Sequence, residues 1–119
     1  MIQTLTPDFI HFDERGKLIQ LCKEGFEQVN VLYSDAGTTR GEHYHKICQE
    51  AFFVINGSVI VTLCSGDETR EQTFSSGDFF MIEPFVTHSL YFPEDCILIA
   101  LYDKCVELEN GEKDIYADH

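Results

Sequence analysis

The feature that most constrains this chain is a series of short apolar runs separated by turn signals. The sharpest of these signals is Asn56–Gly57, which lies between AFFVI and SVIVTL. Both residues of an Asn-Gly pair accept positive φ, so the pair is typical of a β-hairpin. No long segment keeps apolar residues at helical spacing. Many short strands with Gly and Pro turns predict an all-β sandwich or a small barrel.

The predicted strands are rich in apolar, β-branched or aromatic residues and end at turn residues. Their bounds are Lys17–Cys22, Gln28–Ser34, Glu42–His45, Ala51–Ile55, Ser58–Cys64, Arg70–Phe74, Phe79–Glu83, Thr87–Phe92 and Cys96–Tyr102. Asp13, Arg15 and Gly16 are expected to form a turn ahead of the first strand. At most one helical turn is expected, at the start of the chain or in Lys104–Asp114.

Several predicted strands, among them AFFVI, SVIVTL and CILIALY, are apolar on both faces. One face can fill the interior of a barrel, and the other needs a second sheet or a partner chain. We therefore expect a homodimer.

Length and charge limit the possible functions. The 119 residues fit one domain over 1–119. A net charge of −13 argues against nucleic acid and anionic membrane surfaces as partners. No apolar run reaches the roughly 18 residues of a membrane span, and no signal peptide is seen. Five cysteines without metal-finger spacing favour free thiols in the cytoplasm, and the role of Cys48 stays open.

The stretch RGEHYHKICQE concentrates groups that can do chemistry. Residues two apart on a strand share a face, so His43 and His45 are expected side by side. Glu50 on the next strand and His88 after a Pro turn can join them. These four residues suit a divalent transition metal such as Zn, Fe, Mn or Ni. Without a metal, His43 and His45 would be catalytic acid–base groups.

Other polar side chains are candidates for substrate binding. Arg40 is either an anion clamp, because its guanidinium suits planar anions, or a solvated charge. Tyr91 and Tyr102 could place a hydroxyl near a substrate, although rings on strands also serve as packing. His11 and His119 are expected at the surface.

The chain resembles the cupins in two motifs. Residues 37–57 read GTTRGEHYHKICQEAFFVING, which is similar to the first cupin motif of Gly, HxH, Glu and Gly. Residues 77–91 read GDFFMIEPFVTHSLY, which is similar to the second. Here Pro84 comes one residue late, Val86 replaces the usual Gly and the final Asn is missing, but His88 is kept. The resemblance implies an all-β cupin double-stranded β-helix, a jelly-roll-like barrel.

A finer resemblance is carried by FDERGKLIQL, EQVNVLYSDAGTTRGEHYHK and AFFVINGSVIV. These look like the small cupins that isomerise or epimerise dTDP- or UDP-linked 4-keto-6-deoxy sugars in surface-polysaccharide pathways. The tail DKCVELENGEKDIYADH looks like their acidic, Tyr-containing tails. Members with Gln in place of the glutamate work without metal and others bind zinc, so Glu50 places this chain nearer the metal-binding type.

The resemblance therefore implies an enzyme acting on a sugar nucleotide. Removing the hydrogen beside a ketone needs a base of near-neutral pKa and a group that holds the enolate oxygen. His43 or His45 would be that base, unless a metal occupies both, in which case the base is another group such as a tyrosine. Two alternatives stay open: a metal-dependent oxygenase or other small-molecule enzyme, and a non-catalytic cupin that binds a small ligand.

Overall fold

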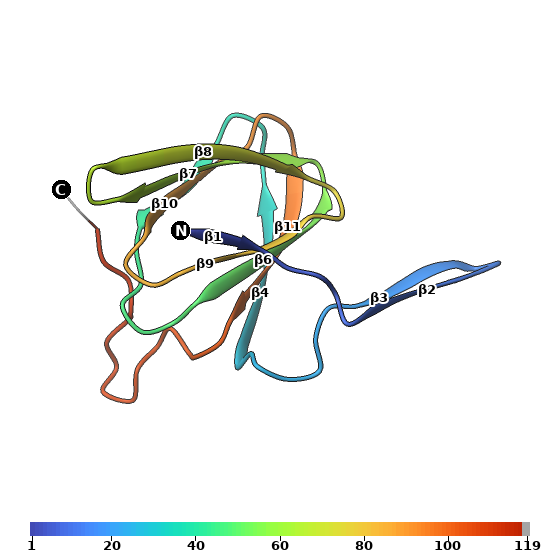
Figure 1. Cartoon of the computed structure of the whole chain (residues 1–119), viewed down its shortest axis with the longest axis horizontal. Coiled ribbons are helices and arrows are strands. Elements are labelled where there is room, and N and C mark those ends of the chain that lie inside the picture. Colours follow the sequence, from blue (N-terminus) through green and yellow to red (C-terminus); the bar gives the residue numbers. More distant parts are fainter. Residues whose placement is uncertain (118–119) are drawn as a thin grey trace.

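A computed structural model describes residues 1–117, which form β-strands joined by turns and loops and contain no helix (Figure 1). The strands are β1 (Ile2–Thr4), β2 (Phe9–Asp13), β3 (Gly16–Gln20), β4 (Gln28–Ser34), β5 (Thr39–His43), β6 (Glu50–Asn56), β7 (Ser58–Ser65), β8 (Glu68–Ser75), β9 (Phe79–Ile82), β10 (Thr87–Tyr91) and β11 (Cys96–Tyr102). The predicted all-β fold is confirmed. Within the described part of the chain, no segment is a long apolar helix that could cross a membrane.

Two antiparallel sheets build the barrel. One has the order β1-β9-β6-β11-β4, and the other has the order β5-β10-β7-β8. The hairpin β2–β3 forms a third sheet of its own. Strands adjacent in space are often distant in sequence: β4 pairs with β11, and β5 pairs with β10. This topology brings both predicted motifs to the same barrel.

Two predicted strands, Gln28–Ser34 and Cys96–Tyr102, match the structure at both ends. Strands β1 and β2 were not predicted, because their apolar residues are too few or too exposed to give a clear alternation. The expected limit of at most one helical turn agrees with the structure, in which residues 1–117 contain no helix. The start of the chain is extended, and the described tail contains turns, bends and the bridges of Glu107 with Lys113 and of Tyr116 with Tyr44.

The interior of the barrel is aromatic. Phe74 stacks on Phe80 with ring centroids 3.8 Å apart, and Phe52 stacks on Phe80 at 5.3 Å. Phe52 and Val54 point inward from β6, as does Glu50 at the start of the same strand, and all three are buried. One strand therefore supplies both core residues and a buried carboxylate.

The outer face of the larger sheet is partly covered by the chain itself. Ala51, Phe53, Phe79 and Leu101 form a second cluster, against which Leu5, Ile19, Leu21, Cys22, Phe26, Met81 and Ile99 pack. The N-terminal segment and the segment after β3 thus cover this part of the sheet. The expectation that this second apolar face needs a separate sheet or a partner chain is wrong for these residues.

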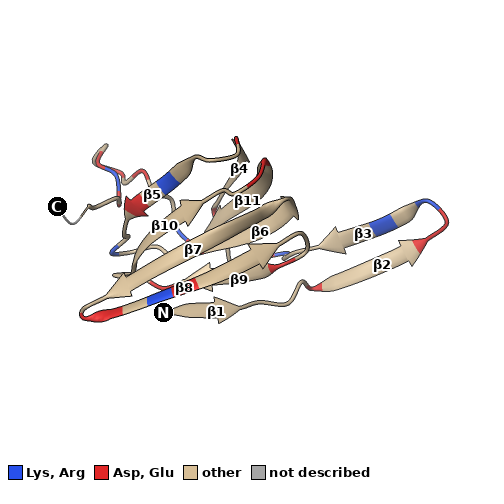
Figure 2. Ribbon diagram, turned by 90° about the horizontal axis from the view of Figure 1, so that it is seen from above, with Lys and Arg blue, Asp and Glu red and all other residues tan. Residues whose placement is uncertain are grey.

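The hairpin β2–β3, which we call the arm (residues 9–20), projects away from the barrel (Figures 1 and 2). Its exposed apolar side chains are Phe9, Ile10, Phe12 and Leu18. The turn predicted at Asp13, Arg15 and Gly16 is confirmed and forms the tip of the arm. Further exposed apolar side chains, Val29, Val31 and Tyr33, lie on β4 at the edge of the larger sheet.

Candidate active site

A local irregularity in β5 places the first histidine. His43 pairs with His88 on β10, and Gly41 pairs with Ser89, so Glu42 has no register partner on β10 and the strand bulges there. Gly41 and Glu42 have φ of 92° and 62°, values that favour glycine. A Cβ on Gly41 would lie 2.8 Å from the main-chain oxygen of His88. The glycine therefore allows the close approach that brings His43 and His88 together.

The second histidine lies beyond the strand. The extended run predicted over Glu42–His45 ends at His43, and the following Tyr44 forms an isolated bridge with Tyr116 of the tail. His45 then sits in the loop before β6, with its ring centroid 5.0 Å from that of His43. The prediction that the two imidazoles lie close together is confirmed, although they do not share one regular strand.

Four predicted residues converge inside the barrel. The donor atoms of His43, His45, Glu50 and His88 all lie within 4.8 Å of one another. His45 Nε2 is 3.0 Å from Glu50 Oε1, and His88 Nε2 is 3.2 Å from the same oxygen. Glu50, His45 and His88 are buried, and His43 is half-buried. The sequence therefore identified the cluster correctly.

The surroundings drive the two neighbouring histidines toward opposite charge states. Burial, together with nearby His88, lowers the pKa of His43 to about 4 despite the attraction of Glu50. Burial also acts to lower the pKa of His45, but its hydrogen bonds, including those to Cys48 and Glu50, raise it to about 10. At neutral pH and without a metal, His43 is neutral and His45 is an imidazolium.

Glu50 is the counter-ion of the charged His45. Its burial acts to raise its pKa, but the contacts with His45 and His88 lower the pKa to about 2. The neighbouring Tyr102 has its pKa raised, first by burial and then by the charge of Glu50, so its hydroxyl keeps its proton. Burial raises the pKa of the Cys48 thiol as well. Among these groups, Glu50 is therefore an anion, His45 a cation, and His43, Cys48 and Tyr102 are neutral.

The donor set fits a divalent metal. Two ligand atoms about 2.0–2.2 Å from one ion are about 3.0–3.5 Å apart at tetrahedral or octahedral angles. The distances from Glu50 Oε1 to His45 and His88 fall in this range. His88 Nε2 is fully buried and, among residues 1–117, makes no hydrogen bond, although it lies 3.2 Å from Glu50 Oε1. A bound cation would satisfy this nitrogen.

A pocket of about 180 Å³ opens onto the cluster. It is lined by Leu32, Arg40, Gly41, His43, Glu50, Phe52, His88, Leu90 and Tyr102. Arg40 is exposed and is held by Ser34 Oγ at 2.8 Å and by the carbonyl of Tyr33 at 3.1 Å. The structure thus brings Arg40 and Tyr102 to this pocket, as the sequence predicted.

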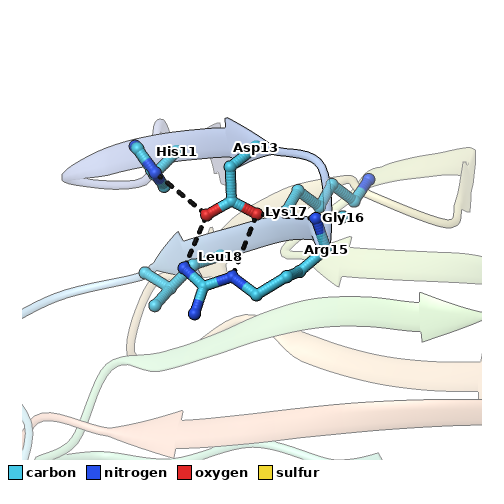
Figure 3. A pocket seen from close by; sticks show the side chains of 6 residues that line it. All are labelled: His11, Asp13, Arg15, Gly16, Lys17 and Leu18. Atoms are coloured by element: carbon cyan, nitrogen blue, oxygen red, sulfur yellow. Dashed lines mark hydrogen bonds and ion pairs between the residues drawn. The ribbon is translucent and has the colours of Figure 1, made fainter.

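Other predicted residues lie elsewhere. Tyr91 is 42% exposed and does not line the pocket, because it alternates on β10 with the inward-facing Leu90. The proposal that it binds substrate is therefore withdrawn. His11 is at the surface, as expected; it lies on the arm beside Asp13 in a separate groove of about 300 Å³ (Figure 3). His119 lies outside the described residues.

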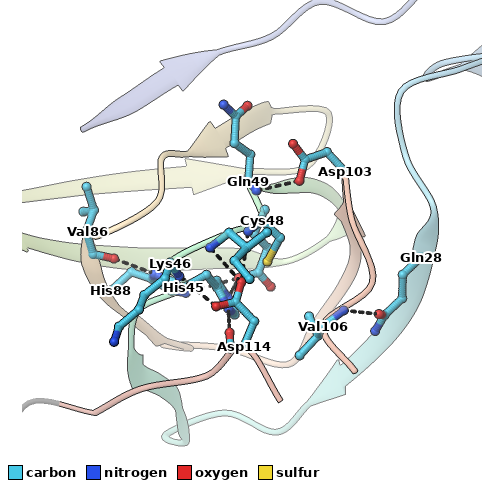
Figure 4. Close-up of polar contacts among 12 residues, drawn as sticks. Gln28, His45, Lys46, Cys48, Gln49, Val86, His88, Asp103, Val106 and Asp114 are labelled. Carbon is cyan, nitrogen blue, oxygen red and sulfur yellow. Dashed lines mark hydrogen bonds and ion pairs between the residues drawn. The ribbon is translucent and has the colours of Figure 1, made fainter. Parts of the chain in front are cut away.

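The sequence analysis missed Asp114. This residue is fully buried, and its carboxylate accepts hydrogen bonds from the backbone N–H groups of Lys46, Ile47 and Cys48 (Figure 4). Its main-chain oxygen is 2.6 Å from His45 Nδ1. No local signal marks it, because it is one acidic residue of an acidic tail.

A family model described as polysaccharide biosynthesis C-terminal domain matches residues 11–100. The chain belongs to this family. The match spans the arm, the first motif and the whole cluster of histidines and glutamate. A search of curated proteins found no match.

Solved structures agree with this assignment to the polysaccharide biosynthesis C-terminal domain family. QdtA, a sugar 3,4-ketoisomerase from Thermoanaerobacterium thermosaccharolyticum whose structure contains TDP, is similar with a TM-score of 0.81 and 22% identity, over 99% of this chain and 88% of that one. A 3,4-ketoisomerase from Helicobacter canadensis has a TM-score of 0.82 and 20% identity, over 98% and 90%. The Mycobacterium tuberculosis RmlC epimerase has a TM-score of 0.71 and 17% identity, over 87% and 63%. The predicted cupin fold is confirmed.

Proposed function

We propose that the chain is an isomerase or epimerase of a nucleotide-linked 4-keto-6-deoxy sugar. The observation that carries this proposal is the pocket lined by a neutral His43 and by Glu50, whose carboxylate is paired with the protonated His45. A pair of titratable groups held in opposite protonation states is the usual basis of proton-transfer catalysis. The similar ketoisomerase QdtA has also been crystallised, as a variant, with TDP-4-keto-6-deoxyglucose, which supports this substrate class.

The proposed reaction begins with the transfer of one carbon-bound proton. Neutral His43 takes the hydrogen from the carbon beside the ketone, and the electron pair of that C–H bond moves to give an enolate. Tyr102, which keeps its proton and lines the pocket, can donate a hydrogen bond to the enolate oxygen. Return of the proton to the former ketone carbon, with the proton of the adjacent hydroxyl passing to the former ketone oxygen, moves the ketone by one carbon and isomerises the sugar. Return of the proton to the opposite face of the carbon that lost it epimerises the sugar. His45, which is an imidazolium in the metal-free site, would be an acid that returns a proton rather than the base.

In a second form of the same proposal, the site binds a divalent transition metal. His43, His45, Glu50 and His88 would hold it, and when bound it would polarise the ketone oxygen. His43 and His45 would then be ligands, and the proton would be exchanged by another group, for which Tyr102 in the pocket lining is the candidate. The identity of the metal among Zn, Fe, Mn and Ni is part of what the experiment below determines.

The nucleotide is proposed to lie outside the cavity. At about 180 Å³ the pocket is smaller than the roughly 300–1,000 Å³ typical of complete ligand sites, so it suits the sugar alone. Arg40 stands at its rim and could bind a phosphate. On a chain with a net charge of −13, a positioned cation matters for an anionic substrate.

We also propose that a second copy of this chain covers the exposed apolar surface. A two-stranded hairpin is marginally stable alone, and the arm exposes Phe9, Ile10, Phe12 and Leu18. Each copy also offers the apolar face of β4, so the arm of one copy and the sheet of another can pair reciprocally about a twofold axis. The free thiols are compatible with the predicted cytoplasmic location.

The test is solvent exchange of the substrate. Protein purified without a metal-affinity tag is analysed for metals and incubated with TDP-4-keto-6-deoxyglucose in D₂O. We expect deuterium at the carbon beside the ketone, and at least a roughly 100-fold lower rate in His43→Gln and in His45→Gln. Tyr91→Phe, on the outer surface, is the control and should keep the wild-type rate.

Three results would contradict the proposal. Binding of TDP- or UDP-linked keto sugars without exchange would indicate a binding protein. Oxygen uptake by an iron-loaded form without exchange would indicate an oxygenase. Neither binding nor exchange would exclude this substrate class. Stoichiometric metal that is lost in His45→Ala would select the metal-bound form of the mechanism.

A further inference from the structure

The tail of the chain is fastened to the loop that carries His45. Tyr44 and Tyr116 exchange two main-chain hydrogen bonds of 2.8 and 3.0 Å, and their rings stack at 5.6 Å. Lys46 Nζ lies 4.1 Å from the centre of the Tyr116 ring. Between these contacts Asp114 is fully buried, and its N–H donates to the carbonyl of Val106. The tail therefore has a fixed position relative to the loop.

Asp114 makes two kinds of contact from this position. Its carboxylate accepts the N–H groups of Lys46, Ile47 and Cys48 at 2.9, 3.0 and 3.0 Å. Its main-chain oxygen lies 2.6 Å from His45 Nδ1 (Figure 4). The side chain binds the loop that follows the histidine, while the main chain binds the ring. Together the two contacts hold both the imidazole ring of His45 and the loop that follows it.

The contact with the ring determines which nitrogen carries the proton. A carbonyl oxygen only accepts hydrogen bonds, so Nδ1 of His45 must donate and must be protonated. The other nitrogen, Nε2, lies 3.0 Å from Glu50 Oε1 on the side of the histidine cluster. A ring held in this way can gain or lose a proton, or bind an ion, at Nε2 alone.

We propose that Asp114 is a positioning residue that holds His45 with its proton on Nδ1 and presents Nε2 as the reactive nitrogen. The inference rests on the proposed function, because the orientation matters only if His45 acts in proton transfer or metal binding. Asp114 touches neither pocket nor substrate. Its effect passes through the imidazole, whether His45 works as a proton carrier or as a ligand.

The test compares two carboxylates that cap the same loop. Asp114→Asn keeps the size of the side chain but replaces one acceptor oxygen by an N–H₂ group, which cannot accept the loop N–H groups. Asp103→Asn is the matched control, because Asp103 Oδ1 caps the N–H of Gln49 at 2.7 Å but does not touch His45. The readouts are the NMR signal of the His45 Nδ1 proton, in zinc-loaded and metal-free protein, and kcat and KM for solvent exchange of the sugar nucleotide.

Wild-type protein should show an Nδ1 proton that exchanges slowly with water. In Asp114→Asn we expect this exchange to be about tenfold faster or more, and kcat to fall about 10- to 100-fold with little change in KM. Asp103→Asn should retain the slow exchange and kcat. Equal losses in both variants, or a protected Nδ1 proton with unchanged kcat in Asp114→Asn, would overturn the proposal.

A measurement on the wild type covers the case in which Asp114→Asn does not fold. A scalar coupling across the hydrogen bond, from His45 Nδ1 to the carbonyl carbon of Asp114, should be detectable, and an Nδ1 without a proton would refute the inference. The NMR readout does not depend on substrate. If the wild type has the Nδ1 proton but does not exchange the hydrogens of the sugar nucleotide, the proposed function is wrong. The inferred position of His45 would still be supported.

Discussion

His43 and His45 are chemically identical side chains two residues apart, yet their surroundings move their pKa values in opposite directions. His43 has no carboxylate in hydrogen-bond contact and lies beside another imidazole, so burial dominates. His45 has Glu50 on one side and a carbonyl on the other, and both favour the charged ring. The chemistry of the site depends on these contacts rather than on the residue type.

These shifts predict a pH optimum for the stability of the metal-free protein. The pKa of His43 is lowered from 6.5 to about 4, so the unfolded chain binds more protons and stability falls as the pH drops from 6.5 to about 4. Glu50, lowered from 4.5 to about 2, extends this loss further into acid. His45 is raised from 6.5 to about 10, so its contribution is complete below pH 6.5 and is lost as the pH rises toward 10.

We therefore expect the free energy of unfolding, measured by urea denaturation in the presence of a chelator, to be highest near pH 6.5. The loss by pH 9.5 should be on the order of 1–3 kcal/mol. Burial also raises the pKa of Cys48 and other thiols, which adds a loss at alkaline pH. His45→Gln should remove the part of this alkaline loss of stability that His45 causes. An alkaline branch that is the same in this variant and the wild type would show that His45 is not the cause.

At the residue scale, the sequence predicted the cluster because its signal was local. The HxH spacing, the glutamate and the second motif marked His43, His45, Glu50 and His88. Asp114 lies 69 residues from His45, and only the folded chain joins them. Tyr91 failed for the opposite reason: the residue type was suitable, but the alternation of β10 points it outward.

At the scale of elements, the strands whose apolar runs have clear boundaries were predicted well. Strands β4 and β11 match at both ends because turn residues flank each apolar run. Strand β5 was misplaced, since TRGEH has no apolar side chains to mark it and its pairing with β10 is a tertiary effect. Its bulge, with positive φ at both Gly41 and Glu42, cannot be predicted from the alternation of side chains along a regular strand.

The bulge predicts a specific sensitivity at Gly41. Gly41→Ala would add a Cβ that lies 2.8 Å from the His88 carbonyl oxygen, at a φ of 92°. We expect a loss of about 2–4 kcal/mol in the free energy of unfolding, from strain at positive φ and from overpacking. The measurement is urea denaturation, combined with metal binding by calorimetry, because β10 must move and carry His88 with it.

Gly37→Ala is the control for this prediction. Gly37 has a similar φ of 83°, but a Cβ there would meet nothing within 4 Å. The strain at positive φ alone should therefore cost about 1–2 kcal/mol and leave metal binding unchanged. If both variants lose the same stability and bind metal equally, the close contact between β5 and β10 is not important for the site.

At the scale of the whole molecule, the barrel and the arm differ in how they are stabilised. The barrel has an aromatic core, whereas most apolar side chains of the arm are exposed. Figure 2 shows basic (blue) and acidic (red) positions on the ribbon at the tip of the arm, where Arg15 forms an ion pair with Asp13. An ion pair this exposed to solvent contributes little to stability. The contacts that hold the arm are expected to come from a second copy.

This expectation predicts the effect of a charge on the arm. Phe12 is 70% exposed, so Phe12→Asp should leave the barrel folded while placing a carboxylate in the proposed interface. We expect the dimer dissociation constant to rise at least about tenfold, measured by light scattering after size-exclusion chromatography. Thr73→Asp, at an exposed position of β8, is the control. A wild-type protein that is monomeric at micromolar concentration would contradict the dimer.

The contact between His45 and Asp114 has a consequence for how the protein is made. Synthesis proceeds from the N-terminus, so the barrel strands leave the ribosome before the residue that supports the histidine. A nascent chain shorter than 114 residues can contain every strand of the barrel and still lack a correctly held His45. The proposed reactive centre is therefore completed by a residue that is translated after the last barrel strand, when the fold around it can already exist.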